Sequence, residues 1–189
     1  MPDGPTEREI VRGLRMGDRR VWAELCERFG PRVWRHIARL IGGDAEAVAD
    51  VFQETFLAVA RSGRRLDENA KLWGWLTRIA HNQAALHWRK VHRGSRAETH
   101  GEPARIRAEG DPFDALDRRE TAAIVRGALA EMPADHVALL TAKYLDELSV
   151  AEIVERLGGT VESVRSRLAR ARRDLRERYE RMTASRAET

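Results

Sequence analysis

Apolar residues recur at helical spacing through most of this chain, and this periodicity constrains the fold more than any other feature. The clearest example is residues 44–62, where apolar positions follow the i, i+3, i+4 spacing of one buried helix face. The same period runs through residues 10–37 and 72–92, and it returns from Leu116 onwards. No segment has the alternation or the β-branched run of a strand, so the sequence predicts an all-α protein.

A stretch rich in glycine and proline interrupts the helical pattern near the middle of the chain. Residues 93–112 contain only one large apolar residue, Ile106, among several glycines and prolines. Such a composition is typical of a flexible tether between folded units. We therefore expect two small helical domains joined by a flexible linker. The expected boundaries are 1–92 for the first domain, 93–113 for the linker, 114–182 for the second domain and 183–189 for a tail.

The composition excludes several classes of protein. No apolar run approaches the ~18 residues of a membrane-spanning helix, and the first residues lack the basic and apolar regions of a signal peptide. The single cysteine, Cys26, makes neither an internal disulfide nor a thiolate metal cage. His81, His87 and His92 lack the i, i+4 spacing of a helical metal site. We expect a soluble cytoplasmic protein without membrane insertion, metal or cofactor.

Charge is segregated along the chain although the total is modest, with 34 basic and 30 acidic residues giving a net charge of +4. Residues 71–93 carry five bases and no acid, and residues 160–182 carry eight arginines against four acids. Residues 44–54 carry four acids and no base. Two separate basic segments indicate a polyanion bound at two places. The alternative interpretation is a set of solvated helix faces.

A helix-turn-helix is the strongest local signal, and it lies near the C-terminus. Ser149 and Glu152 have the spacing of a capping box at the start of a short helix. Gly158 and Gly159 can supply the turn, and Thr160 is a plausible N-cap for the basic helix that follows. In this motif the N-terminal part of the second helix enters the major groove of DNA. The alternative is an ordinary helical hairpin with a solvated basic face.

The basic segment before the linker combines cations with aromatic and amide side chains. Arg78, His81, Asn82, Trp88 and Arg89 share one face of the expected helix. Another face is apolar, and it consists of Leu72, Leu76, Ile79 and Leu86. Cations that follow the backbone and aromatics that stack on bases suit single-stranded nucleic acid. Core packing is the preferred role for Trp73 and Trp75, while both roles stay open for Trp88.

The helix expected at residues 44–61 has an exposed face of mixed character. Asp50, Gln53 and Glu54 lie opposite the apolar stripe, and Leu57 stands among them as an apolar exception. A solvated face would explain the acids. A mixed acidic and apolar face is also a suitable docking surface for a basic partner helix, and the residues alone do not decide between the two interpretations.

Five segments resemble a known family. Residues 44–57, DAEAVADVFQETFL, resemble the D-A-E-D-x-x-Q-E-T-F-L segment of sigma region 2, and residues 75–82, WLTRIAHN, resemble the segment that follows it. Residues 129–133, 148–153 and 164–172 resemble sigma region 4. The whole is similar to a bacterial RNA polymerase sigma factor of the sigma-70 family, extracytoplasmic-function (ECF) group. The resemblance implies a transcription initiation factor that directs the polymerase to promoters and helps to open them.

The resemblance also implies roles for particular residues. Residues that would dock on the clamp helices of the β′ subunit are Asp50, Gln53, Glu54 and Leu57. Residues that would read the −10 element are Arg64, Arg65, Asn69, Arg78, Asn82, Trp88 and Arg89. Residues that would read the −35 element are Thr160, Glu162, Ser163, Arg165, Ser166, Arg167 and Arg170. The implied partners are core RNA polymerase, through the β′ clamp helices and the β flap, and promoter DNA, with an anti-sigma factor as a candidate regulator.

Two rival functions are weighed against this one. A stand-alone helix-turn-helix regulator explains the C-terminal domain but leaves the acidic face and the basic helix at 72–92 without a purpose. An enzyme is not expected, because the sequence has no phosphate-binding glycine loop with lysine, no paired His/Cys metal set and no nucleophile elbow.

Overall fold

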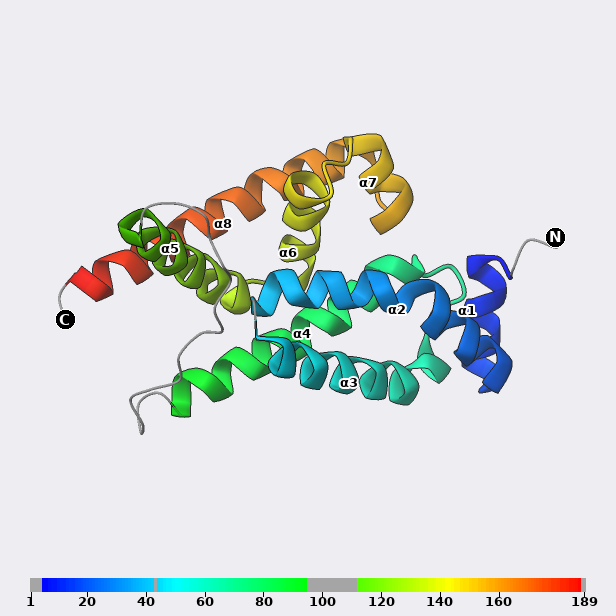
Figure 1. The fold of residues 1–189 in the computed structure, drawn as a ribbon. Coiled ribbons are helices and arrows are strands. Elements are labelled where there is room, and N and C mark those ends of the chain that lie inside the picture. The colour runs from blue at the N-terminus through cyan, green and yellow to red at the C-terminus, as the bar shows by residue number, and fades with distance from the viewer. Residues whose placement is uncertain (1–4, 43, 95–111, 188–189) are drawn as a thin grey trace.

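The computed structural model describes residues 5–42, 44–94 and 112–187, and every regular element within these ranges is a helix. The helices of the N-terminal domain are α1 (Glu7–Met16), α2 (Arg19–Ile41), α3 (Ala45–Ser62) and α4 (Leu72–Gly94), with a 3₁₀ turn at Gly63–Arg65. The helices of the C-terminal domain are α5 (Pro112–Glu131), α6 (Ala134–Leu140), α7 (Val150–Leu157) and α8 (Val161–Ala187), with a π-helical turn at Thr141–Leu145. The predicted all-α class with two helical domains is confirmed (Figure 1). No described helix is long and apolar enough to span a membrane.

The apolar period at residues 10–37 belongs to two helices, α1 and α2, instead of one. Gly17 ends α1 in the left-handed conformation with φ of 73°, which glycine adopts without steric cost. Asp18 then caps α2, because its carboxylate accepts a hydrogen bond from the Arg20 backbone N–H at 2.8 Å. A change of helix axis between these residues lets both helices cover the same core.

The core of the N-terminal domain lies where α2, α3 and α4 pack against one another. Leu25, Phe29 and Val33 of α2 are almost completely buried, and they meet Val59 of α3 and Leu76 of α4 in one cluster. The apolar stripe predicted for α3 faces this core. Trp73 is 6% exposed and belongs to the same cluster, which confirms the packing role expected for it.

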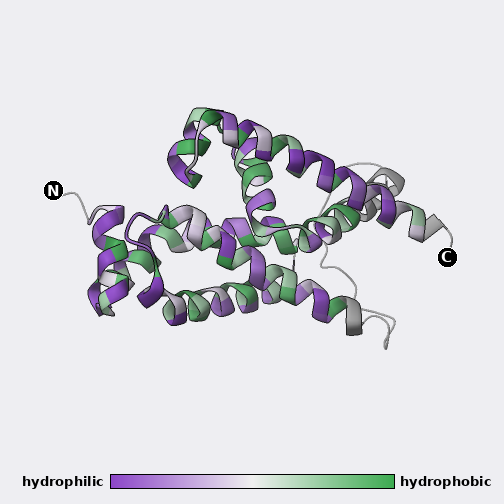
Figure 2. Ribbon diagram, turned by 180° about the vertical axis from the view of Figure 1, so that it is seen from behind, coloured by the Kyte–Doolittle hydropathy of each residue, from purple (hydrophilic) through white to green (hydrophobic). Residues whose placement is uncertain are grey.

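The C-terminal domain is a smaller bundle, and α8 packs along α5, α6 and α7. Its apolar cluster includes Leu139, Ile153, Val164 and Leu168. Helix α8 reaches Ala187, so the segment expected to be a tail from residue 183 is helical through that residue. No glycine or proline interrupts α8, and Arg178 donates to Asp174 at i, i+4 with a distance of 2.6 Å. Most of the α8 ribbon is coloured as hydrophilic in Figure 2.

The two domains pack against each other. Helix α4 contacts α5, α6 and α7, and α2 contacts α5. Met132, at the junction between α5 and α6, is 4% exposed and lies in the same apolar cluster as the N-terminal core. The predicted linker falls mostly at residues 95–111, which lie outside the described ranges. This close packing of the domains sets the geometry of the candidate sites.

Candidate nucleic-acid interface

The turn and the second helix of the predicted helix-turn-helix are formed as expected. Gly158 and Gly159 both have positive φ, at 82° and 100°, which allows the tight turn between α7 and α8. Thr160 and Ser163 cap α8 reciprocally: the Thr160 N–H donates to Ser163 Oγ at 3.0 Å, and the Ser163 N–H donates to Thr160 Oγ1 at 3.2 Å. The capping box of α7 is also present, with the Ser149 N–H donating to Glu152 Oε2 at 2.8 Å.

Helix α8 separates an inward apolar stripe from an outward polar face. Val164 is 0% exposed, Leu168 is 5% exposed and Ala171 is 0% exposed. The predicted DNA-reading residues that are exposed on the other side are Thr160, Glu162, Arg165, Ser166 and Arg170, while Ser163 and Arg167 are half-buried. The helix is therefore anchored on one side and presents arginines on the other, as a recognition helix requires.

The predicted face of α4 is divided between surface and interior. Arg78, Asn82 and Arg89 are exposed. His81 is 2% exposed, and its Nε2 lies 3.1 Å from the carbonyl oxygen of Met132 in the C-terminal domain. Trp88 is half-buried, and its indole N–H donates to the Leu40 carbonyl at 3.1 Å. The hydrogen bond ties this tryptophan to α2, which favours packing over base stacking in this arrangement.

The remaining residues of the predicted −10 set lie in the connection between α3 and α4. Arg64 and Arg65 are exposed in the 3₁₀ turn, and the buried Leu66 anchors the loop next to them. Asn69 is exposed, and its backbone N–H donates to Asp67 Oδ1 at 2.8 Å, which closes a local turn. The loop therefore holds its cations at the surface beside the start of α4.

An open cleft of about 580 Å³ lies between this loop and the helix-turn-helix. The N-terminal domain lines it with Arg65, Lys71, Trp75 and Arg78 among others. The C-terminal domain lines it with Asp135, Ala138, Leu157, Gly158 and Arg167. The structure thus brings residues from both predicted DNA-reading sets to one place.

Asp135 of α6 is a residue that sequence reasoning missed, and it contacts both sets. Its Oδ1 accepts hydrogen bonds from Arg78 Nε at 2.9 Å and from Arg78 Nη2 at 2.5 Å. Its Oδ2 lies 3.9 Å from Arg167 Nη2. Its only sequence signal is its place as an acid in the first turn of α6, where an acid is common for local reasons.

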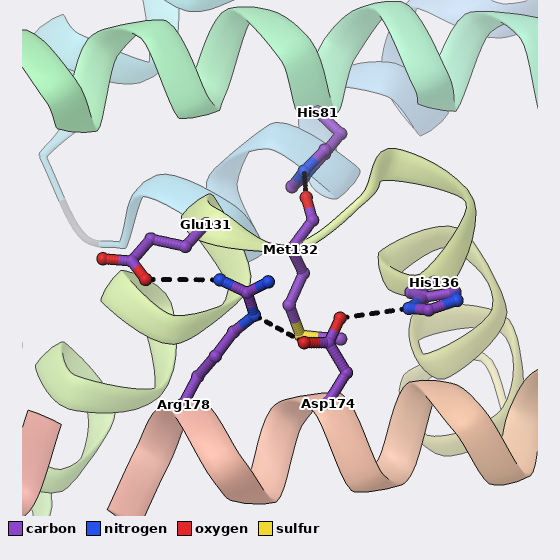
Figure 3. A network of polar contacts seen from close by, with 6 residues as sticks. All are labelled: His81, Glu131, Met132, His136, Asp174 and Arg178. Atoms are coloured by element: carbon purple, nitrogen blue, oxygen red, sulfur yellow. Dashed lines mark hydrogen bonds and ion pairs between the residues drawn. The ribbon is translucent and has the colours of Figure 1, made fainter. Parts of the chain in front are cut away.

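A polar network holds α5, α6 and α8 together (Figure 3). Arg178 Nη1 lies 3.3 Å from Glu131 Oε2, and Asp174 Oδ2 lies 3.1 Å from His136 Nδ1. Partial desolvation opposes ionisation of Asp174, but hydrogen bonds from Arg178 and His136 prevail and lower the pKa of its carboxyl. The network fixes the helix-turn-helix relative to the junction at Met132, whose carbonyl meets His81.

The acidic face of α3 is turned away from the core. Asp50, Gln53 and Glu54 are exposed, and Leu57 is 40% exposed. Trp34 of α2 adds an aromatic side chain that is 38% exposed, and its ring packs against Phe52 of α3 with centroids 5.4 Å apart. Sequence reasoning missed Trp34. Its only signal in the sequence is that it is aromatic and lies outside the apolar stripe of its helix.

In the described ranges no group of His, Cys, Asp and Glu side chains is arranged to hold a metal ion.

Comparisons with known proteins match both domains. Residues 25–94 match the family model described as Sigma-70 region 2, and residues 122–175 match that of Sigma-70, region 4. The RNA polymerase sigma-H factor of Pseudomonas aeruginosa is 30% identical over 177 residues, covering 88% of this chain and 90% of its own. The ECF RNA polymerase sigma factor SigW of Bacillus subtilis is 28% identical over 174 residues, covering 88% of this chain and 92% of its own.

Two further comparisons are more limited. The ECF RNA polymerase sigma factor SigE of Mycolicibacterium smegmatis is 32% identical over 160 residues, which cover 82% of this chain and 60% of that relative. The solved structure described as CnrH in complex with the cytosolic domain of CnrY has a TM-score of 0.49 and 22% identity, and it covers 90% of this chain and 94% of its own. From the matches to both sigma regions and the relatives over most of the chain, it follows that this protein belongs to the ECF group of the sigma-70 family, the initiation factors that direct RNA polymerase to promoters.

Proposed function

We propose that the two domains divide promoter recognition between an opened strand and intact duplex. The proposal depends on one observation above all: in the same chain, α8 buries Val164 and Leu168 while it exposes Arg165 and Arg170, and α4 exposes a second basic face. The face of α8 suits the major groove of the −35 element. Arg64, Arg65 and Asn69 of the loop, with exposed residues of α4, suit the −10 element as single strand.

The acidic face of α3 is the proposed docking surface for core polymerase. Asp50, Glu54 and Leu57 are exposed together on one rigid helix, and Trp34 extends the apolar part of the surface onto α2. An exposed mixture of carboxylates and apolar groups fits the β′ clamp helices, provided that these present basic side chains. The proposed place of action is the cytoplasm, where the polymerase transcribes.

The packed arrangement of the domains implies an order of events. Asp135 engages Arg78 and lies close to Arg167, and the cleft between the loop and the helix-turn-helix faces inward to the domain boundary. Arg78 and Arg167 become free to contact DNA only when Asp135 releases them, which separation of the domains achieves. We infer that the free chain binds promoter DNA weakly and that attachment to core polymerase frees these two arginines and lets each domain engage its own element.

Run-off transcription with purified core polymerase on a library of promoter sequences tests this function. We expect initiation at a subset of sequences that share −10 and −35 motifs, and weak duplex binding by the chain alone. Tight and sequence-specific duplex binding by the free chain, without any effect on initiation, would instead identify a stand-alone helix-turn-helix regulator.

A further inference from the structure

A second cleft, of about 330 Å³, lies at another part of the domain boundary. Helix α2 forms one wall, and the segment from the π-helical turn to α7 forms the other. The polar residues that line it are Arg32, Arg35, His36, Arg39, Asp146 and Arg156. None of these residues belongs to the predicted DNA-reading or docking sets, so the proposed function leaves the cleft unexplained.

Positive charge is in excess in this cleft. Four arginines share one aspartate among the lining residues, an excess of three. Asp146 Oδ1 accepts a hydrogen bond from Arg39 Nη1 at 2.6 Å, and its Oδ2 lies 3.9 Å from Arg156 Nη1. Neither Arg32 nor Arg35 has an ion-pair partner among the described residues.

Arginines from opposite domains repel each other across the cleft. Partial burial lowers the pKa of Arg32 and the charge of Arg156 on the other wall lowers it further, while Asp146 and Glu7 oppose the shift without cancelling it. The Arg32 guanidinium stacks over Trp73 with 4.2 Å to the ring centroid, which keeps it in place. Asp146 offsets part of this repulsion, and the charges that it leaves unbalanced across the domain boundary destabilise the packed arrangement.

His36 adds an independent observation that points to a ligand. Its side chain is 3% exposed, it lines the cleft, and its Nε2 has no hydrogen-bond partner among the described residues. Burial lowers the pKa of His36 to about 4, so the ring is neutral at pH 7 and can offer one N–H from Nε2. Buried polar atoms of native proteins rarely stay unpaired, and an unpaired donor beside several guanidinium groups fits an anion.

We propose that this cleft binds a small anion with a diphosphate group, contacted by Arg32, Arg35 and Arg156, beside the buried and unpaired His36. A terminal phosphate carries about −1.5 to −2 charge at pH 7, so two linked phosphates match the excess of three arginines better than one carboxylate does. The planar guanidinium group also matches phosphate oxygens in pairs. Inorganic pyrophosphate and nucleoside diphosphates share this chemistry.

The bound anion has a consequence for regulation, which rests on the proposed function. Because the walls belong to both domains, the anion binds the packed arrangement and stabilises it by mass action. The packed arrangement keeps Arg78 against Asp135. A bound anion therefore opposes the domain separation that promoter recognition needs. It lowers the equilibrium constant for separation by a factor that grows with the ratio of the free anion concentration to its dissociation constant.

Calorimetric titration of the full free chain with inorganic pyrophosphate at fixed ionic strength tests the site. We expect binding by the wild type and at least a tenfold loss of affinity in the pair Arg32→Gln with Arg156→Gln. The matched control is the pair Arg19→Gln with Arg176→Gln, which removes the same charge from exposed positions outside the cleft. Equal losses in the two pairs, or no binding by the wild type at millimolar pyrophosphate, overturn the proposal.

Three additions make the test decisive. If the first pair fails to fold, Arg35→Gln changes an exposed residue of the same wall and is expected to weaken binding by at least threefold. If the pair Arg165→Gln with Arg170→Gln abolishes binding, the anion binds the helix-turn-helix and the proposal fails. A parallel titration with ADP identifies the source: equal affinities mean that the diphosphate alone is recognised, and tighter ADP binding means that a nucleotide is.

The structural consequence is measured by small-angle scattering on the variant Asp135→Asn, which weakens the Arg78 contact by removing its charge. We expect pyrophosphate to reduce its radius of gyration towards that of the wild type, and an unchanged radius contradicts the bridging role. Neither measurement contains polymerase. If pyrophosphate does not bind, the run-off assay still tests the proposed function. If the run-off assay shows no promoter-specific initiation, the dissociation constant for pyrophosphate still tests the anion site.

Discussion

Arg78 and Asp135, 57 residues apart in the sequence, are joined by two hydrogen bonds to one carboxylate oxygen, at 2.9 and 2.5 Å. This contact links a residue of the basic face of α4 to the first turn of α6. The same aspartate lies 3.9 Å from Arg167 of α8. The Asp135 carboxylate therefore interacts with one arginine from each predicted DNA-reading set. Both arginines become available to DNA together when these contacts break.

Replacement of Asp135 by asparagine is expected to increase binding of the free chain to a single-stranded −10 oligonucleotide. Exposed ion pairs contribute up to about 1 kcal/mol, so the expected gain in affinity is up to about fivefold. Fluorescence anisotropy of a labelled oligonucleotide measures it. The control is Glu155→Gln, an exposed acid of α7 with the same change in charge. An equal gain in both variants means that net charge alone, and not release of Arg78, is responsible.

Charge reversal on the acidic face of α3 is expected to abolish assembly with core polymerase. Asp50→Arg with Glu54→Arg places two cations where the proposed partner helices are basic, and like charges across an interface strongly disfavour it. Both side chains are exposed, so the free energy of unfolding is expected to change by no more than about 0.5 kcal/mol for each. Co-elution with core on gel filtration is the measurement.

A matched reversal on another helix controls this experiment. Glu177→Arg with Glu180→Arg changes the charge equally at exposed positions of α8. This variant is expected to co-elute with core. Normal co-elution of the α3 variant as well would refute the docking assignment.

Loss of either exposed arginine of α8 is expected to lower transcription from the cognate promoter while core binding persists. A bidentate contact to guanine discriminates by about 1–3 kcal/mol, so Arg165→Ala or Arg170→Ala lowers promoter affinity by roughly fivefold or more. Run-off transcription and core co-elution are measured together. Arg176→Ala, later on the same helix, is the control. Parallel loss of core binding in the α8 variants would contradict a −35 role.

Stability is expected to fall as the pH drops from about 6.5 towards 4, because two histidines are buried in the neutral form. Burial lowers the pKa of His36 to about 4 and also lowers that of His81. For His36 the nearby charges of His81 and Arg39 act in the same direction, and Asp146 opposes them. The unfolded chain takes up protons near the ordinary value of 6.5, whereas the folded chain does not, so the stabilisation is complete above that pH and is lost below it.

Urea unfolding at several pH values measures this dependence. Each such group contributes a slope of up to about 1.4 kcal/mol per pH unit. His36→Phe removes its share of the slope, while the exposed substitution Asn82→Ala leaves the slope unchanged. A pH-independent free energy of unfolding in the wild type between these values would show that the imidazoles are not buried in solution.

The faces of α4 illustrate where prediction from the sequence failed. Leu86 was expected on the apolar face with Leu72 and Leu76, yet it is 41% exposed. His81 was expected on the polar face, yet it is 2% exposed. His81 is buried because α4 packs against the C-terminal domain as well as its own, so the Met132 junction covers part of its polar side. The apolar spacing along a helix predicts one buried face, so it does not reveal a second face that another domain covers.

The sequence by itself determined the helices, the stripe of α3 and the helix-turn-helix, because apolar spacing, capping residues and glycine turns act over a few residues. It also carried the motifs of both sigma regions. Only the tertiary structure decided how the two domains meet: that Asp135 engages Arg78, that Trp88 bonds to Leu40, and that arginines gather around His36. These contacts join residues far apart in the chain, and no local periodicity encodes which exposed faces meet across a domain boundary.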